Sequence, residues 1–153
     1  MTAEFAVAIH SVVFLCHKKK YVSSSEIADN VCTNPARIRK IMNKLISAKI
    51  VETKNGVGGG YIFSLNPSDV NLFDILTALD EKIVSHKWHS GDKNKPCQVA
   101  FGMDAVTENI YNTINIAGYE ILKKITIEDI IKTLFPNGEE KANICGECKK
   151  NLL

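Results

Sequence analysis

The first apolar block of the chain, residues 5–16, is hydrophobic on almost every side of a helix, so it predicts a helix that is buried on several faces. Thr2 is a suitable N-cap for this helix. A second, short helix is expected to begin at Ser23 and to run to about Val31, because Ser23 and Glu26 have the spacing of a capping box. The pattern therefore predicts two helices before residue 32.

The third helix has the clearest periodicity in the sequence. From residue 38 onward, apolar residues recur three and four positions apart, which is the stripe of an amphipathic helix. Thr33 or Asn34 can cap this helix and Pro35 suits its first turn, so residues 32–35 are expected to form a tight turn. The side opposite the stripe is polar and basic, with Ala36, Lys40, Asn43 and Lys44 at its centre and Arg37 and Arg39 on its flanks.

Two short strands are expected next, over residues 50–54 and 61–65. The loop between them, residues 55–60, contains four glycines and is typical of a flexible hairpin tip. A short helix, a turn, an amphipathic helix with a basic outer side and a hairpin follow one another in the order of a winged helix-turn-helix. We therefore interpret the hairpin as a candidate wing.

The second half of the chain is predicted to be helical. Asn71 can cap a helix over residues 72–81, and Thr126 can cap a last short helix. Between them, a polar loop leads to a long helix from residue 97 to about 124, whose apolar positions lie alternately three and four apart. A seam of this length favours pairing with a second copy of the chain. The seam positions are Val99, Met103, Val106, Ile110, Ile114, Ala117 and Ile121.

These elements divide the chain into four parts. We expect a winged helix-turn-helix DNA-binding head at residues 1–83, a loop at 84–96, dimerisation helices at 97–135 and a flexible tail at 136–153. The predicted fold class is mainly α with a small β-hairpin wing, joined to a long dimerisation helix.

The composition agrees with a small folded protein. The chain has 153 residues, of which 45% are hydrophobic and 24% charged, which excludes a large multidomain enzyme and argues against wholesale disorder. Its most apolar stretch is about 12 residues long, whereas a membrane span needs about 20. The residues before that stretch also lack the basic leader of a secretion signal. We expect a cytoplasmic protein with no membrane partner.

The positive charge of the chain is concentrated in its first half. Residues 1–66 hold nine Lys and Arg against four Asp and Glu, whereas residues 67–153 hold ten against thirteen. Within the first half, residues 30–51 carry five cations and no acid. Such a local field suits the phosphates of a nucleic acid, and a plain helical bundle with a solvated basic face is the alternative.

The third helix is of a kind that can read duplex DNA. The major groove admits one α-helix, whose first turns reach the base edges while neighbouring cations neutralise phosphates. Arg39 and Lys44 are expected to contact the DNA backbone, and the glycine-rich tip to reach the minor groove. The expected base-reading positions are Thr33, Asn34, Ala36, Arg37 and Lys40.

Several motifs give the chain a resemblance to a known family. Residues 23–42, the Gly58-Gly59-Gly60-Tyr61 segment and residues 71–76 resemble the Rrf-type bacterial winged helix-turn-helix regulators, the family of IscR, NsrR and CymR. The resemblance implies a homodimeric transcription factor, usually a repressor and not an enzyme, that binds a near-palindromic operator in double-stranded DNA. It also implies that residues 34–40 begin the recognition helix and that the wing contains Asn55, Gly58, Gly59, Gly60 and Tyr61.

The cysteines leave open what such a regulator would sense. Cluster-binding members of the resembled family carry three closely spaced cysteines before the long helix, whereas this chain has only Cys97 there. An iron–sulfur cluster usually needs four ligands, so we expect no cofactor. An iron–sulfur or metal sensor that recruits His86, His89 or the Cys145 and Cys148 pair is the alternative.

A thiol switch has more favourable local chemistry. Cys32 lies just before the third helix and Cys97 at the start of the long helix, and both positions favour the reactive thiolate. Oxidation of Cys32, or a bond from it to Cys97 of either subunit, would displace the turn and release DNA. Packing roles for both cysteines are one alternative. A small thiol oxidoreductase that uses Cys145 and Cys148 is another, although no thioredoxin-like pattern surrounds that pair.

Overall fold

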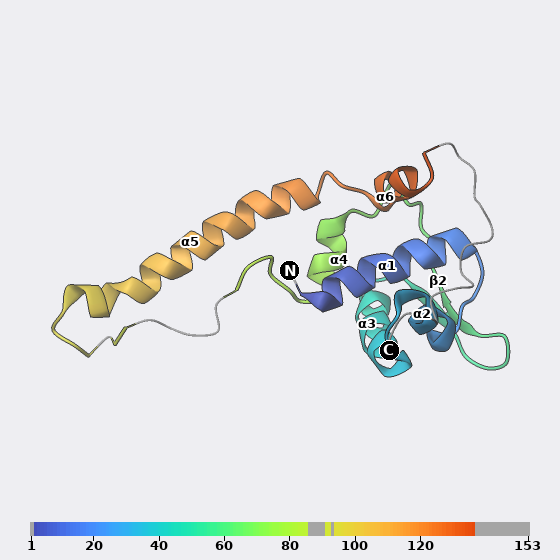
Figure 1. Ribbon diagram of the computed structural model, residues 1–153, viewed down its shortest axis with the longest axis horizontal. Helices are drawn as coiled ribbons and strands as arrows, with labels where there is room; N and C mark the ends of the chain where they lie inside the picture. Colours follow the sequence, from blue (N-terminus) through green and yellow to red (C-terminus); the bar gives the residue numbers. More distant parts are fainter. Residues whose placement is uncertain (1, 86–90, 93, 137–153) are drawn as a thin grey trace, which may run out of the picture.

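The computed structural model of the chain describes residues 2–85, 91–92 and 94–136. Within them it contains six α-helices and one two-stranded antiparallel sheet, which confirms the mainly α class. The helices are α1 (Ala3–Lys18), α2 (Ser24–Val31), α3 (Pro35–Ser47), α4 (Leu72–Ala78), α5 (Gln98–Leu122) and α6 (Ile127–Leu134), and the strands are β1 (Glu52–Lys54) and β2 (Gly60–Ile62). Figure 1 shows a head formed by α1 to α4, the sheet and α6, with α5 extending away from it.

Side-chain caps fix the starts of α1, α2, α4 and α6 at the predicted residues. The hydroxyl of Thr2 accepts hydrogen bonds from the first backbone N–H groups of α1, and the hydroxyl of Ser23 accepts one at the start of α2. α4 and α6 begin with complete capping boxes at Asn71 and Thr126. Each cap satisfies N–H groups that have no partner within the helix, so the spacing that predicted these starts is confirmed.

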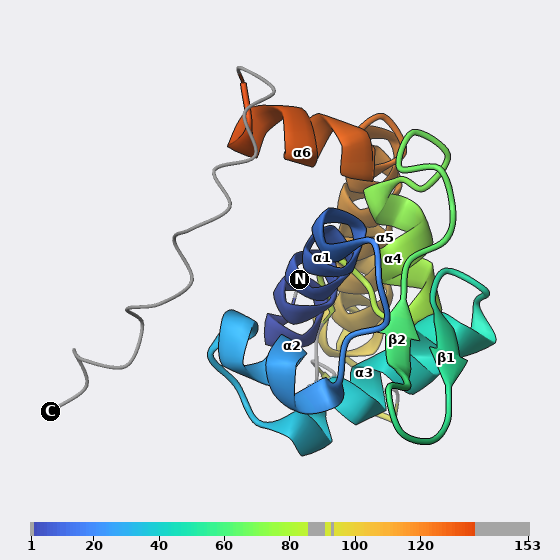
Figure 2. The ribbon, with the colours of Figure 1, turned by 90° about the vertical axis from the view of Figure 1, so that its right-hand side faces the viewer.

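α1 is the central helix of the head. It packs against α2, α3, α4 and α6, and Figure 2 shows these helices arranged around it. The apolar stripe predicted for α3 lies inside this core, because Ile38, Ile41, Met42 and Leu45 are fully buried. Burial of each such side chain stabilises the head by about 1.5–3 kcal/mol.

The hairpin is shorter than the sequence predicts. Only three residues pair in each strand, with Thr53 opposite Tyr61. Ile50 and Phe63, which the alternating pattern assigned to the strands, lie beyond the paired residues and are buried in the core of the head. The apolar residues before β1 and after β2 are therefore part of the core, and only a small hairpin remains on the surface.

A residue from the connection between α1 and α2 joins this sheet. The N–H of Val22 donates to the carbonyl of Tyr61 at 2.9 Å, and the N–H of Tyr61 donates to the carbonyl of Val22 at 2.8 Å. Gly60 allows this approach, because it has a positive φ of 144° and a Cβ there would collide with the carbonyl of Val22. The hairpin is thus anchored to the α1–α2 connection.

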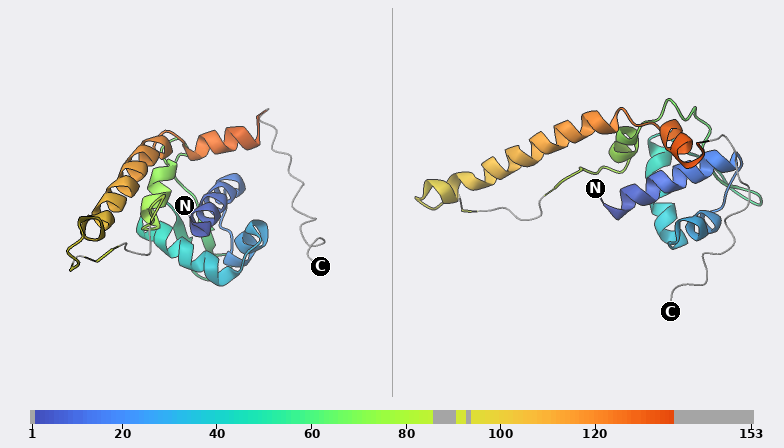
Figure 3. Two further views of the ribbon diagram at one scale, coloured as in Figure 1. Left: turned by 60° about the vertical axis from the view of Figure 1, so that its left-hand side comes forward. Right: turned by 45° about the horizontal axis from the view of Figure 1, so that its top comes forward.

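α5 is 25 residues long, which corresponds to about 37 Å. Its C-terminal part packs on the head: the side-chain amide of Asn115 exchanges hydrogen bonds with the backbone of Val84, and the rings of Phe73 and Tyr119 are 5.0 Å apart. The two views of Figure 3 agree that the rest of α5 projects beyond the head. None of the described helices combines the length and apolarity needed to cross a membrane.

Candidate nucleic-acid interface

Hydrogen bonds of the α2–α3 turn hold the start of α3 in place. Of the two candidate caps, Asn34 is the one used, since its Oδ1 accepts the N–H of Arg37 at 2.8 Å. Cys32 ends α2 in the left-handed conformation, with a φ of 57°, and the N–H of Thr33 donates to the carbonyl of Ala28 at 2.9 Å. These bonds set the angle at which α3 leaves α2.

The α2–α3 turn and the tip of the hairpin lie on the same side of the head. Figure 2 shows both at the lower edge of the molecule, with β1 and β2 beside α3. The major groove of B-DNA is about 12 Å wide and therefore accepts one helix. A hairpin beside that helix then lies over the flanking backbone and the neighbouring groove. A duplex laid against this side would meet the start of α3 and the hairpin together.

Most of the predicted base-reading side chains reach solvent. Arg37 and Arg39 make no ion pair with any carboxylate in the described part of the chain. Their guanidinium groups can therefore bind phosphates or the edge of a guanine. Asn34, Ala36, Arg39 and Lys40 are exposed, and Thr33 and Arg37 are half-buried.

The two lysines of α3 are engaged within the head. The ammonium of Lys40 lies 3.2 Å from a carboxylate oxygen of Glu4 on α1. The ammonium of Lys44 donates to the carbonyl of Leu79 at 2.7 Å and lies 3.9 Å from the other oxygen of Glu4. Lys44 is half-buried by these contacts, with 35% of its side chain exposed, and its expected contact with the DNA backbone stays a prediction.

The tip of the hairpin is open to solvent. Asn55 and Gly58 are exposed, and Gly59, Gly60 and Tyr61 are half-buried. The side chain of Tyr61 packs against the core and so supports the hairpin from inside. Val57, which the sequence analysis did not single out, is the most exposed large hydrophobic residue described. The signal that could have marked it is an apolar residue between glycines, since apolar side chains on such tips can enter a minor groove.

Cys32 and Cys97 lie far apart in the chain's structure. Both are exposed, and Cys97 is the N-cap residue of α5. Backbone N–H groups of Ala100 and Val99 lower the pKa of the Cys97 thiol. The head lies at the other end of α5 (Figure 1), about 37 Å away, whereas a disulfide needs Cα atoms within about 7 Å. A disulfide between Cys32 and Cys97 of one chain was one form of the expected switch, and that form of the prediction is therefore wrong.

The described residues do not fit an iron–sulfur cluster. Among residues 2–85, 91–92 and 94–136, no three His, Cys, Asp or Glu side chains gather in a group that could hold a metal ion. Cys97 alone cannot replace the four ligands that a cluster usually needs. His86, His89, Cys145 and Cys148 lie outside the described residues, so the expectation of no cofactor stays a prediction.

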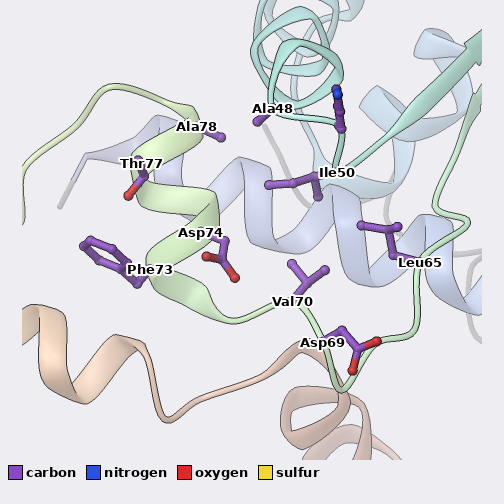
Figure 4. Close-up of a pocket in the computed structure, with 10 residues that line it drawn as sticks. Ala48, Ile50, Leu65, Asp69, Val70, Phe73, Asp74, Thr77 and Ala78 are labelled. Carbon is purple, nitrogen blue, oxygen red and sulfur yellow. The ribbon is translucent and has the colours of Figure 1, made fainter.

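An open depression of about 530 Å³ lies between residues 48–50, which follow α3, the segment that leads into α4, and α4 itself. Figure 4 shows the apolar side chains of Ile50 and Val70 beside the carboxylate of Asp74. That carboxylate accepts the N–H of Asn71 at 2.9 Å, so its charge serves the cap of α4. We assign the depression no part in nucleic-acid binding, because the exposed start of α3 is at the opposite end of that helix.

Known proteins resemble the chain over most of its length. A family model described as Rrf2, iron-dependent transcriptional regulator, matches residues 1–133. YwnA of Bacillus subtilis (strain 168), which is named as an HTH-type transcriptional regulator, is 26% identical over 135 residues, or 88% of this chain and 99% of YwnA.

Two solved structures share the fold. A transcriptional regulator structure from Lactobacillus plantarum has a TM-score of 0.79 at 23% identity, over 90% of this chain and 93% of that one. IscR of T. potens has a TM-score of 0.64 at 20% identity, over 94% of this chain and 90% of that one. These likenesses confirm the winged-helix architecture.

Proposed function

Because the chain belongs to the Rrf2 family of transcriptional regulators, we propose that it is a homodimeric repressor that binds a near-palindromic operator in double-stranded DNA. Regulators of this family are not enzymes, and neither is this chain, which sets aside the thiol oxidoreductase alternative. One observation carries the proposal: the exposed, basic start of α3 and the tip of the hairpin face the same side of the head (Figure 2).

The start of α3 makes the contacts that read sequence. Arg37 donates to the major-groove edge of a guanine, and the methyl group of Ala36 lies against a thymine methyl. The Oδ1 of Asn34 is used in the helix cap, so this residue offers its amide donors to the bases. Arg39 binds a phosphate from the flank of the helix. Lys40 binds a phosphate only after its ion pair with Glu4 is broken.

The hairpin binds in the neighbouring minor groove. Glycines at its tip let the backbone approach the duplex closely, and the exposed side chain of Val57 supplies an apolar contact with the groove. Contacts of this kind depend on groove width more than on base identity. The hairpin therefore adds affinity and fixes the orientation of α3.

The seam of α5 supports the homodimer. Its six large hydrophobic residues, Val99, Met103, Val106, Ile110, Ile114 and Ile121, are between 46% and 71% exposed in a single chain. A continuous apolar row of this length is unusual on a monomer, and pairing of two α5 helices buries it. A two-fold pair presents two heads, and two heads require two similar half-sites in the DNA.

Oxidation of a thiol is the proposed signal for release from DNA. The lowered pKa of Cys97 favours its thiolate, which attacks a peroxide to give a sulfenic acid and hydroxide. Condensation of that sulfenic acid with the thiol of Cys32 in the other subunit then forms a disulfide and releases water. A bond at Cys32 moves the turn that aims α3, so the dimer leaves its operator.

Selection of bound DNA fragments tests the proposal. The purified protein is mixed with sheared genomic DNA of its source, and the retained fragments are sequenced. The expected result is enrichment of one near-palindromic motif, with half-sites separated by whole turns of the duplex. Retention of no sequence above the input at low ionic strength would contradict DNA binding.

A gel shift on the selected motif tests the switch. Mild oxidant is expected to release the wild-type protein and to leave Cys32→Ser and Cys97→Ser bound. Equal release of all three proteins would rule out both thiols as the sensor.

A further inference from the structure

Asn115 differs from the rest of α5 because its side chain is both polar and buried. Among the described residues, the buried polar side chains are those of Ser11 and Asn115, and Asn115 is 4% exposed. The hydroxyl of Ser11 donates to the carbonyl of Val7 in its own helix at 2.7 Å. The partner of Asn115 is 31 positions away in the sequence, so its burial serves a contact between two parts of the chain.

Two hydrogen bonds join Asn115 to the segment that follows α4. Its Oδ1 accepts the N–H of Val84 at 3.0 Å, and its Nδ2 donates to the carbonyl of Val84 at 2.9 Å. The two bonds satisfy both backbone groups of Val84 at once. Both are lost together if α5 slips on the head, since a slip by one residue moves a helix by about 1.5 Å and turns it by about 100°.

The neighbouring contacts of α5 with the head are apolar. A Cβ at Gly118 would collide with the Cδ1 of Ile83, so the backbone of α5 packs directly on that side chain. The rings of Phe73 and Tyr119 meet at 5.0 Å, and both views of Figure 3 place α4 beside this end of α5. Apolar contacts are non-directional, whereas a buried, hydrogen-bonded amide fixes one register, as a polar residue does in a coiled coil. The pair of bonds at Asn115 is therefore the contact that defines how α5 sits on the head.

The seam of α5 lies on a different side of the helix from Asn115. The seam residues nearest to it in sequence, Ile114 and Ala117, are exposed in the single chain. With about 100° between successive residues, Asn115 lies about 100° from Ile114 and about 160° from Ala117 around the helix. Asn115 can therefore fix the head on α5 without being part of the proposed dimer interface.

We propose that Asn115 is a positioning residue that fixes the head on α5 and thereby determines which spacing of half-sites the dimer accepts. This inference rests on the proposed homodimer and its operator of two half-sites. In such a dimer each α3 is connected to its partner copy through its own α5, so the two Asn115–Val84 contacts set the distance and rotation between the two α3 helices. One base pair added between the half-sites separates them by about 3.4 Å more and rotates them by about 35°. A stiff joint rejects that change, and a loose joint accepts it.

The test measures affinity for the selected operator, for the same half-sites with one base pair more or fewer between them, and for a single half-site. The full-length wild-type protein is compared with Asn115→Leu, which keeps a similar size but cannot hydrogen-bond, and with Asn112→Leu, the same change at an exposed position of α5. The wild type is expected to prefer the native spacing by about tenfold or more, and Asn115→Leu to lower that preference about tenfold, the contribution of two hydrogen bonds. Asn112→Leu keeps the preference, and all three proteins bind the single half-site equally.

Asn115→Ala is the second variant, because it leaves room for water to bond to Val84, and it is expected to lose the same preference. Circular dichroism and sedimentation velocity establish that each variant is a folded dimer, and failure of both to fold would make Asn115 a folding residue and contradict the inference. Wild-type spacing preference in either folded variant, or equal binding of all spacings by the wild type, overturns the inference and leaves the proposed function intact. A wild-type protein that binds no duplex, or binds the operator no better than the single half-site, overturns the proposed function itself.

Discussion

The carboxylate of Glu4 on α1 lies 3.2 Å from the ammonium of Lys40 on α3. The lysine side chain is 67% exposed and that of Glu4 25% exposed, so the pair contributes only about 0–1 kcal/mol to the stability of the head. Its larger effect is electrostatic. A fixed negative charge next to the helix that meets DNA repels phosphates and occupies a cation that could bind them.

Removal of this carboxylate is expected to strengthen DNA binding. In Glu4→Gln, Lys40 is released to bind a phosphate, so duplex affinity rises and the slope of log K against log salt becomes steeper by about 1. Fluorescence anisotropy titrations over a range of salt measure both changes. Glu108→Gln, which removes an exposed carboxylate from α5, is the matched control and keeps the wild-type slope. A Glu4→Gln variant with unchanged or weaker binding would show that Lys40 has no access to DNA.

The cap at Asn34 is expected to stabilise the fold as well as the interface. Asn34→Ala removes the acceptor of the Arg37 N–H and lowers the free energy of unfolding by about 1 kcal/mol. Urea denaturation followed by circular dichroism measures the loss. Asn34→Asp keeps an acceptor and retains most of the stability. Asn43→Ala, an exposed substitution within the same helix, is the control, and equal stability of both alanine variants would refute the capping role.

The seam of α5 is expected to determine the oligomeric state. Ile110→Glu places a charge in the middle of the proposed dimer interface, where burial of an unpaired carboxylate is unfavourable, so the protein sediments as a monomer and loses affinity for a two-half-site operator. Asn112→Glu adds the same charge on another side of the helix and leaves the dimer intact. Sedimentation velocity distinguishes the species. Dimers of equal stability in both variants would place the interface elsewhere.

The pKa of Cys97 predicts a pH dependence of its alkylation. The alkylation rate follows the thiolate population, which grows as the pH rises through the pKa of the thiol. Since N–H groups of Ala100 and Val99 stabilise the thiolate, the midpoint of the rate profile lies below that of an ordinary thiol. Iodoacetamide labelling, read by mass spectrometry at several pH values, gives the midpoint, with Cys97→Ser as the blank. A midpoint at or above that of a free cysteine peptide contradicts this assignment.

Local sequence signals predicted the helix starts correctly. The caps at Thr2, Ser23, Asn71 and Thr126 each depend on residues within three positions of one another, so the sequence contains all the necessary information. The apolar stripe of α3 is equally local, and its spacing identified the face that the core buries.

Local sequence signals could not predict contacts between residues that are far apart in the chain. Lys44 meets Leu79, 35 positions away, and Lys40 meets Glu4, 36 positions away. A helical wheel shows both lysines on the outer side, but only the packing of α1 and α4 against α3 decides which charges remain exposed. The strands were predicted too long for the same reason, since Ile50 and Phe63 satisfy a β pattern but are buried in a core that the pattern does not reveal.

The central claim, that the start of α3 reads DNA sequence, is tested most directly by one pair of titrations. The affinity of Arg37→Ala is compared with that of the wild-type protein on the selected operator and on a random duplex. The account predicts a loss of about 1–3 kcal/mol on the operator, or about 5- to 150-fold, and a much smaller loss on the random duplex. Equal losses on both duplexes would contradict the claim that Arg37 contacts a base.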